Sequence, residues 1–237
     1  TEIRARDGNG KSSKGRMQKV IKSGNFYCGF AGMAKDDITG FDVIGLFNKA
    51  VNAGGNFIDI INRFQNIVLE PLARAWEGIK RDDPTKYDEK VSGGDSVILQ
   101  IVVGTIENAI PKLTAIDFAA TPGEKGPRPI KPFPTNCPGD CPGEFQIVAL
   151  GEFDAIAKYD TTNPTFKIKN APLRVACFFI GLEADARKDK VGFPVDIVRI
   201  TSKGAEWIQI KNKCPDIQPY TAPEQRKKPT RKSKRRG

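Results

Sequence analysis

Cysteine is the residue type whose spacing in this chain most directly suggests chemistry. Cys137 and Cys141 flank Pro-Gly-Asp, a spacing that can provide half of a zinc site or close a small disulfide loop. No second pair of ligands is evident, so a cross-linked loop or two unpaired thiols fit the sequence better than a metal. Five cysteines in 237 residues are too few for a disulfide scaffold. We therefore expect no metal and no cofactor, and cysteine usage leaves the compartment undecided.

Histidine is absent from the sequence, which removes two common kinds of catalytic site. Neither Ser-His-Asp nor Cys-His catalysis can be built from these residues. The commonest side-chain ligand of transition metals is missing as well. Hydrolases of these two classes are therefore excluded within the sequence.

The net charge of +10 is concentrated near the end of the sequence. The segment Arg226–Arg236 contains eight basic residues and no acidic one, so the rest of the chain carries only about +2 (10 minus 8). Such a segment can bind nucleic acid or another polyanion, or it can act as a flexible solubilising or docking tail. We expect residues 214–237 to form a disordered basic tail.

Helical spacing of apolar residues predicts the helices that carry part of the core. A first helix is predicted over Ile38–Ala53, with Gly54-Gly55 as its stop. A second is predicted over Asn56–Lys80, with a kink at Pro71. Shorter helices are predicted over Gly151–Lys158 and Pro172–Arg187.

Runs of β-branched and aromatic residues predict antiparallel strands, and these strands are grouped along the sequence separately from the helices. Thr1–Arg16 is predicted to be the end of a strand followed by a loop, and a hairpin is predicted from Gln18 around Ser23-Gly24-Asn25. A three-stranded meander is predicted from Ser96–Gly104, Lys112–Asp117 and Phe145–Leu150. A terminal hairpin is predicted from Phe193–Thr201 and Glu206–Ile210. Helices and strands in separate runs indicate an α+β architecture.

The organisation that follows is one domain over residues 1–213 and the basic tail. Within the domain, Thr121–Gly143 contains seven prolines and is predicted to be an exposed insertion without an element of its own. No segment approaches the roughly 20 apolar residues of a bilayer span, so we expect no membrane contact and a cytoplasmic location. Secretion stays open because the first residue is Thr1 rather than Met, and a targeting segment can have been removed.

Three segments near the start resemble the proteasome-type N-terminal-nucleophile (Ntn) hydrolases, in the order that this family has them. Glu2-Ile3-Arg4-Ala5 resembles the acidic-x-Arg-Ala motif that ends the family's second strand. Lys19-Val20-Ile21 resembles the strand that begins with its catalytic lysine. Phe30-Ala31-Gly32-Met33-Ala34-Lys35-Asp36 resembles the Ala-Gly-x-Ala-x-Asp turn before its first helix.

Later segments extend the resemblance to Lys211. Leu99–Gly104, Leu113–Asp117 and Ile147–Gly151 are similar to three strands of the family, and Val191–Ile197 with Ile200–Gly204 is similar to its closing hairpin. The resemblance implies a four-layer αββα sandwich, in which two antiparallel sheets lie between two helical layers. It implies that strands around Lys19–Tyr27 and Ser96–Gly104 lie in stacked sheets, with the first two helices packed together on one face.

The resemblance also implies a catalytic site made of Lys19, Glu2, Arg4 and Gly32. Lys19 would lower the pKa of the nucleophile or of its amino group, and Glu2 would hold Lys19 in place. The Gly32 N–H would face the developing oxyanion, and the three segments would meet in one cleft. A solvated Lys19, a surface ion pair of Glu2 with Arg4, and an ordinary turn glycine are the alternatives.

The family's nucleophile is a threonine at the start of a first strand, and in this alignment Thr1 is not that threonine, because it directly precedes the second strand. The resemblance therefore implies a threonine-type peptidase or amidohydrolase subunit that lacks its first strand here. It implies peptide substrates, and a homo-oligomer or a ring with related subunits. Two departures favour a silent scaffold or assembly subunit instead: Gly151-Glu152-Phe153-Asp154 replaces Gly-Ser-Gly-Ser, and Lys188–Phe193 replaces Asp-x-x-Ser-Gly-Gly. The supporting hydroxyls of the family are then absent, unless Asp154 or Asp189 substitutes for them. A polyanion-binding protein that acts through its tail is the third possibility.

Overall fold

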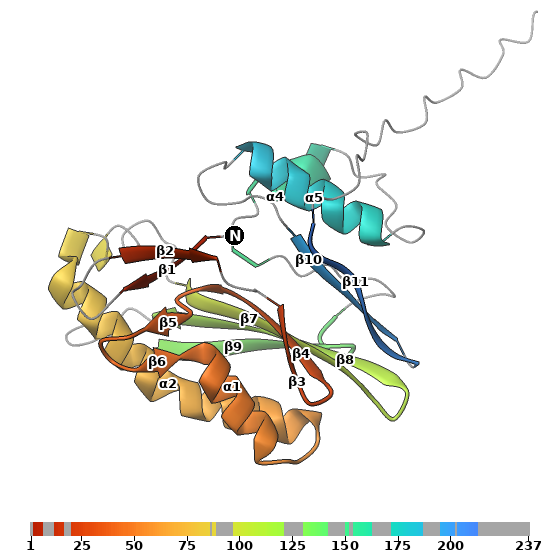
Figure 1. Cartoon of the computed structure of the whole chain (residues 1–237), viewed down its shortest axis with the longest axis horizontal. Coiled ribbons are helices and arrows are strands. Elements are labelled where there is room, and N and C mark those ends of the chain that lie inside the picture. Colours follow the sequence, from red (N-terminus) through yellow and green to blue (C-terminus); the bar gives the residue numbers. More distant parts are fainter. Residues whose placement is uncertain are drawn as a thin grey trace, which may run out of the picture.

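The chain folds into helices and antiparallel sheets of the α+β class (Figure 1). The computed structural model describes residues 2–6, 12–16, 20–85, 87–88, 97–120, 130–141, 150–151, 154–162, 172–186, 195–201 and 203–212. The α+β class predicted from the sequence is therefore confirmed. The predicted strand Phe145–Leu150 falls almost wholly outside these residues, and the basic tail and Lys188–Phe193 fall outside them entirely.

A five-stranded antiparallel sheet forms the centre of the structure. Its strands are β3 (Val20–Ser23), β4 (Phe26–Gly32), β7 (Val97–Glu107), β8 (Ile110–Ala120) and β9 (Ile130–Cys137), in the order β3-β4-β7-β8-β9. Tyr27 pairs with Gly104, so the expectation that these two segments lie in stacked sheets is wrong. The apolar run of β7 has its fully buried residues mainly on the face toward α1 and α2, and it pairs with β4 and β8; such a run does not reveal which strands are its neighbours.

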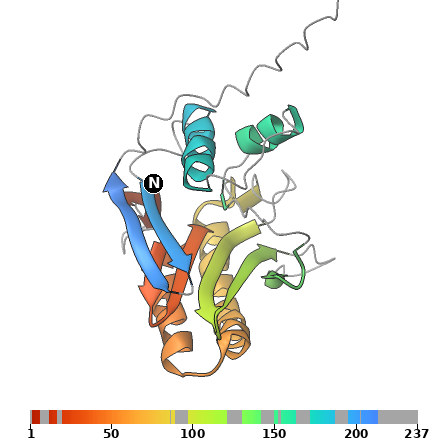
Figure 2. The ribbon, with the colours of Figure 1, turned by 90° about the vertical axis from the view of Figure 1, so that its right-hand side faces the viewer.

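Two helices pack together on one face of this sheet, as predicted (Figures 1 and 2). They are α1 (Val43–Asn52) and α2 (Phe57–Asp82). Phe64 of α2 meets Phe47 of α1 and Phe118 of β8 edge to face, and all three rings are fully buried. Arg63 joins the two helices, because its Nη1 donates to the Ala50 carbonyl at 2.8 Å near the end of α1.

The first helix begins five residues later than the sequence predicts. Residues between Ile38 and Val43 have helical spacing, but they lie in and after the turn of a short hairpin, β5 (Lys35–Asp36) with β6 (Phe41–Asp42). Asp42 ends that hairpin and caps α1 by accepting a hydrogen bond from the Ile44 N–H at 3.0 Å. The second helix begins as predicted, since Asn56 and Asp59 form a capping box.

The proline-rich segment contains a strand, so the prediction of an insertion without elements is wrong for its second half. Residues 130–137 form β9 and pair with β8, with Pro134 opposite Ile116 and Pro132 opposite Phe118. Proline has no N–H to donate to a sheet ladder, and among the strands that the structure describes β9 lies at the edge of the sheet. Prolines two residues apart place their nitrogens on the same outward side, where no ladder bond is lost.

The opening segment contains one strand that was predicted and one that was not. The predicted strand end is β1 (Glu2–Arg6), but part of the predicted loop is β2 (Ser12–Arg16), which pairs with β1 as an antiparallel hairpin. The polar composition of Ser12–Arg16 explains the error, because nothing in it has the apolar alternation of a half-buried strand.

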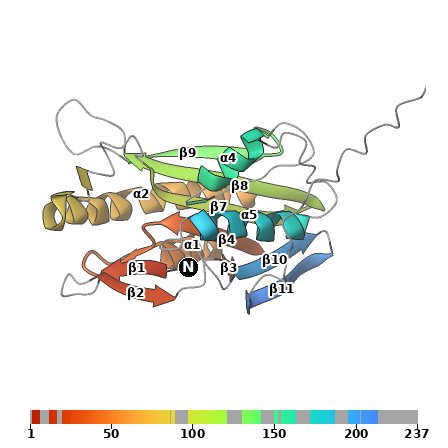
Figure 3. The same ribbon diagram turned by 90° about the horizontal axis from the view of Figure 1, so that it is seen from above.

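The C-terminal half of the described chain lies on the face of the sheet opposite α1 and α2 (Figures 1 and 3). It comprises α4 (Asp154–Thr162), α5 (Pro172–Ala186), and a hairpin of β10 (Val195–Thr201) and β11 (Gly204–Asn212), all close to their predicted positions. The hairpin packs on β7, and a Cβ placed on Gly104 would lie 3.6 Å from Ile200 Cδ1.

Candidate functional site

Gly32 is the predicted site residue that the structure describes best. It ends β4 with φ +90°, a backbone conformation that glycine adopts without strain. A Cβ at this position would overlap the carbonyl oxygen of Ile98 and lie 3.2 Å from Leu99 Cα on β7. The close approach of β4 to β7 is therefore sufficient reason for glycine here, independent of any catalytic role.

Met33, the residue after Gly32, donates its N–H to Ile98 O at 3.0 Å, so the end of β4 is bonded to β7 just beyond Gly32. On its other side β4 pairs with β3, whose described part begins at Val20, opposite Gly29. The described start of β3 therefore lies beside β4, on the side away from β7.

Of the other three predicted residues, Glu2 and Arg4 are placed only through their backbone. Lys19, which immediately precedes β3, lies outside the described residues. Glu2 and Arg4 lie on β1, which packs beside β5, shortly after Gly32 in the chain. The structure thus brings β1 and the end of β4 to the same region, and it describes no contact between the side chains of Glu2, Arg4 and Lys19.

A further segment of the chain, at Gly151, lies against the end of β4. A Cβ on Gly151, whose φ is +83°, would lie 3.4 Å from the Cβ of Ala31. The Gly151 N–H donates to Gln100 Oε1 on β7 at 2.6 Å, and Gln100 Nε2 donates to Asp117 Oδ1 on β8 at 3.0 Å. Gly151, the first residue of the segment that differs from Gly-Ser-Gly-Ser, therefore lies directly beside Ala31, which precedes Gly32.

Ala31, Gln100 and Asp117 form one row across three strands, because Ala31 pairs with Gln100 and Gln100 with Asp117. The row faces away from α1 and α2, since side chains alternate along a strand and the neighbouring Leu99 and Ile101 belong to the core beneath. Gln100 and Asp117 were not singled out from the sequence. The available signal was Gln100 itself, a polar residue in the middle of the apolar run SVILQIVVG.

The helix that follows Gly151 is held by a buried carboxylate that the sequence analysis also missed. Glu183 of α5 is 2% exposed, and its Oε1 accepts the N–H of Ile156 in the first turn of α4 at 2.9 Å. Acidic groups stabilise a helix at this end, where the backbone N–H groups lack partners. The contact ties the start of α4 to α5.

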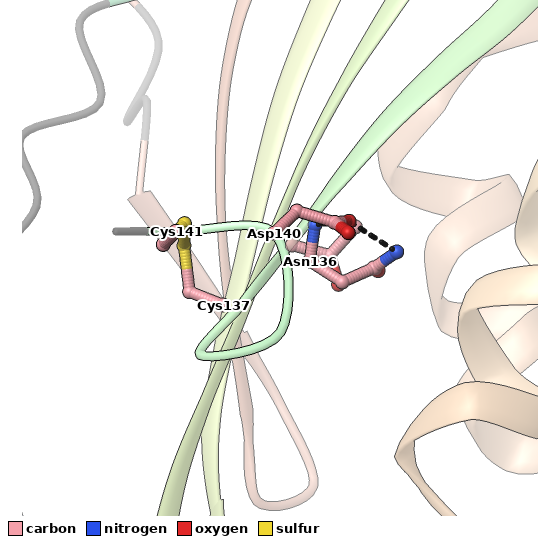
Figure 4. The surroundings of a disulfide bond; sticks show 5 residues. Asn136, Cys137, Asp140 and Cys141 are labelled. Atoms are coloured by element: carbon pink, nitrogen blue, oxygen red, sulfur yellow. Dashed lines mark hydrogen bonds between the residues drawn. A yellow bond between two sulfur atoms is a disulfide. The ribbon is translucent and has the colours of Figure 1, made fainter. Parts of the chain in front are cut away.

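Cys137 and Cys141 form a disulfide, which decides between the alternatives left open by the sequence (Figure 4). The loop is closed a second time by Asp140, whose Oδ2 accepts the Asn136 N–H at 2.8 Å, while the Asp140 N–H donates to Asn136 O at 2.6 Å. Among the described residues, no group of three His, Cys, Asp or Glu side chains is arranged to hold a metal. The loop is a cross-linked end of β9.

The other described cysteines do not offer a reactive thiol. Cys177 is disulfide-bonded. Cys28 is free and lies in the core, and burial raises the pKa of its thiol to about 12. Because the thiolate is the nucleophilic form, Cys28 is chemically inert in the folded protein.

A cavity of about 430 Å³ lies at the tip of the β10–β11 hairpin and includes none of the predicted catalytic residues; it is lined by Arg199, Thr201, Lys203, Gly204, Ala205 and Glu206. Arg199 and Glu206 pair across it at 2.6 Å, and both side chains are more than half exposed. Exposed pairs of this kind contribute only about 0–1 kcal/mol. The cavity is therefore a weaker candidate for a functional site than the end of β4.

Comparisons with known proteins leave the family open. The sequence matches no model of a known protein family, and no curated protein matches it. Within the part of the chain that the structure describes, no helix has the length and apolar character needed to cross a bilayer.

Proposed function

We propose that this chain is a subunit of a proteasome-like, threonine-type peptidase or amidohydrolase, with its site at the end of β4. The observation that carries the proposal is the meeting of separate segments at the end of β4, where β3 pairs alongside, Gly151 lies beside Ala31, and β1 packs beside β5. This is where the resemblance locates the lysine, the acidic residue and the oxyanion donor.

The layered arrangement supports the same proposal. α1 and α2 cover one face of the five-stranded sheet, and the β1–β2 and β10–β11 hairpins with α4 and α5 lie on the other side (Figure 1). We infer a four-layer αββα sandwich, in which the two hairpins belong to the second sheet. That sheet would also hold the strand bearing the nucleophile, which precedes β1 in the family's order.

The proposed chemistry needs a nucleophilic threonine whose own α-amino group serves as the base, with a reference pKa of roughly 8. The Lys19 ammonium favours deprotonation of the groups beside it, and Glu2 orients that ammonium. Arg4, two positions along β1, balances the charge of Glu2. The Gly32 N–H donates to the oxyanion as the amide carbonyl becomes tetrahedral, a contribution that in other hydrolases is worth about 2.7–4 kcal/mol.

The test uses the protein together with the residues that precede Thr1 in its gene, and a small peptide amide as substrate. Lys19→Ala should abolish turnover and leave the melting temperature nearly unchanged. Lys22→Ala is the matched control, because Lys22 is an exposed lysine on the adjacent strand β3. Full activity of Lys19→Ala would eliminate the mechanism.

A non-catalytic scaffold or assembly subunit is the second candidate, and one observation favours it. Asp154, the residue that could replace a missing hydroxyl after Gly151, is instead the first residue of α4, where its charge complements the helix dipole. A scaffold would form an oligomer or a ring with related subunits without any turnover. Native mass spectrometry together with the peptide-amide assay separates the two candidates.

A further inference from the structure

Gln100 is the side chain that connects the centre of the sheet to the Gly151 turn. Gln100 is half-buried, on the face of β7 opposite the completely buried Leu99 and Ile101. Taking an amide group partly out of water is costly unless its polar atoms are bonded. Both of its polar atoms have partners, Asp117 for the nitrogen and Gly151 for the oxygen.

The pairing with Asp117 determines which way the amide faces. A carboxylate at Asp117 only accepts hydrogen bonds, so the amide nitrogen of Gln100 must turn toward it. The amide oxygen is then directed at the Gly151 N–H, at 2.6 Å. A side chain of the same length without this partner on β8 would have no fixed orientation at Gly151.

The Gly151 turn is held against a particular part of β4. Its nearest contact there is Ala31, and Ala31 is covalently joined to Gly32. The φ of +83° at Gly151 favours glycine, and a Cβ there would be in ordinary van der Waals contact with the Ala31 Cβ at 3.4 Å. Gly151 therefore lies beside the residue that precedes the proposed oxyanion donor.

We propose that Gln100, oriented by Asp117, is a positioning residue for the proposed site. Its amide oxygen holds the Gly151 turn at the distance from β4 that leaves room for the scissile carbonyl in front of the Gly32 N–H. The inference rests on the proposed function, and it adds to the resemblance two residues that no motif identified. Displacing a group near reacting atoms by about 1 Å can cost on the order of 100-fold in rate, so the expected effect is on kcat.

Two exchanges of amide and carboxylate test this arrangement in the full chain. Gln100→Glu places two carboxylates within hydrogen-bond distance, and their repulsion drives the side chain at position 100 away from Asp117 and from its place at Gly151. Adding Asp117→Asn restores the hydrogen bond with donor and acceptor exchanged, because the asparagine N–H can donate to the introduced glutamate. The second oxygen of that glutamate can still accept from the Gly151 N–H. Gln65→Glu on α2 is the matched control for the charge change.

The first readout is hydrogen exchange of the Gly151 amide, measured by NMR together with the melting temperature. Exchange should become roughly tenfold faster in Gln100→Glu, return toward the wild-type rate in Gln100→Glu/Asp117→Asn, and stay unchanged in Gln65→Glu. Unchanged protection of Gly151 in Gln100→Glu would overturn the inference, whatever the activity.

The second readout is turnover of the peptide amide. In Gln100→Glu we expect kcat to fall on the order of 10- to 100-fold with a smaller change in KM, and the double variant should recover most of it. Loss of Gly151 protection with unchanged kcat would also overturn the inference. If the wild-type protein has no turnover, the proposed function fails and the positioning role falls with it, while the exchange experiment still decides whether Gln100 holds the turn.

Discussion

Replacing Gly32 by alanine should destabilise the protein far more than replacing Gly40, although both glycines have a positive φ. The two angles are +90° and +73°, so both substitutions force alanine into a conformation it disfavours. They differ in their surroundings: a Cβ at Gly40 meets nothing within 4 Å, whereas a Cβ at Gly32 overlaps Ile98 O. The difference in stability between the two variants therefore measures the effect of the close approach of β4 to β7.

The expected difference can be estimated from these contacts. A left-handed conformation costs alanine about 1–2 kcal/mol, and the lower entropy of the unfolded chain returns about 0.4–1 kcal/mol, so Gly40→Ala should cost about 1 kcal/mol. At Gly32 the backbone of β7 must also move, which breaks the bond from Met33 N to Ile98 O. An unpaired buried group costs about 1–3 kcal/mol, so Gly32→Ala should lose about 2–4 kcal/mol in total.

Thermal unfolding followed by circular dichroism measures both variants. At roughly 2–4 °C per kcal/mol for a chain of this size, Gly40→Ala should lower Tm by about 3 °C and Gly32→Ala by about 10 °C. Equal shifts would refute the reasoning, since they would mean that β4 does not pack closely on β7 at this point. Loss of activity in Gly32→Ala would accordingly reveal nothing about the oxyanion, because the strand end itself is disturbed.

Three further predictions concern other parts of the chain. Arg63→Met should lower the free energy of unfolding in urea by about 1–2 kcal/mol through the lost contacts at the end of α1; Arg74→Met, which removes an exposed pair, should change it by less than about 0.5 kcal/mol. Cys28 should resist iodoacetamide at pH 8 until the protein is unfolded. Because its pKa is raised from 9.0 to about 12, its contribution to stability is complete below pH 9 and is lost as the pH rises toward 12. Deleting Arg226–Arg236 should sharply weaken binding to heparin at low salt and leave folding intact, and unchanged heparin retention would reject a role for the tail.

The parts of the fold that sequence predicted well have strong local signals. Ser23-Gly24-Asn25 marks the β3–β4 turn, where Gly24 has φ +56°, and Asn56 with Asp59 marks the start of α2. The start of α1 was misplaced because the apolar residues of the β5–β6 hairpin happen to continue the helical spacing. Asp42 was the better signal, since it is a residue type that caps helices.

The errors in the sheet arose where tertiary context overrides local preference. Composition argued against a strand at Pro132 and Pro134, and only the edge position of β9 makes these prolines acceptable. Gln100 was not recognised because its partners, Asp117 and Gly151, are 17 and 51 residues away in the chain. Of the predicted site, the structure describes Gly32 fully and the backbone of β1, and the roles of Lys19, Glu2 and Arg4 remain predictions.

The outer side of β9 determines where this chain can be joined by another strand. Pro132 and Pro134 have no N–H to offer, and the N–H of Asn136, which points the same way, is already bonded to Asp140. A strand that adds to a sheet needs donors as well as acceptors along the border it extends, and from Pro132 to Asn136 this border presents carbonyl groups alone. A strand added there would gain few ladder bonds from these residues, which argues against extension of the five-stranded sheet at this stretch by an extended peptide or a second copy of the chain.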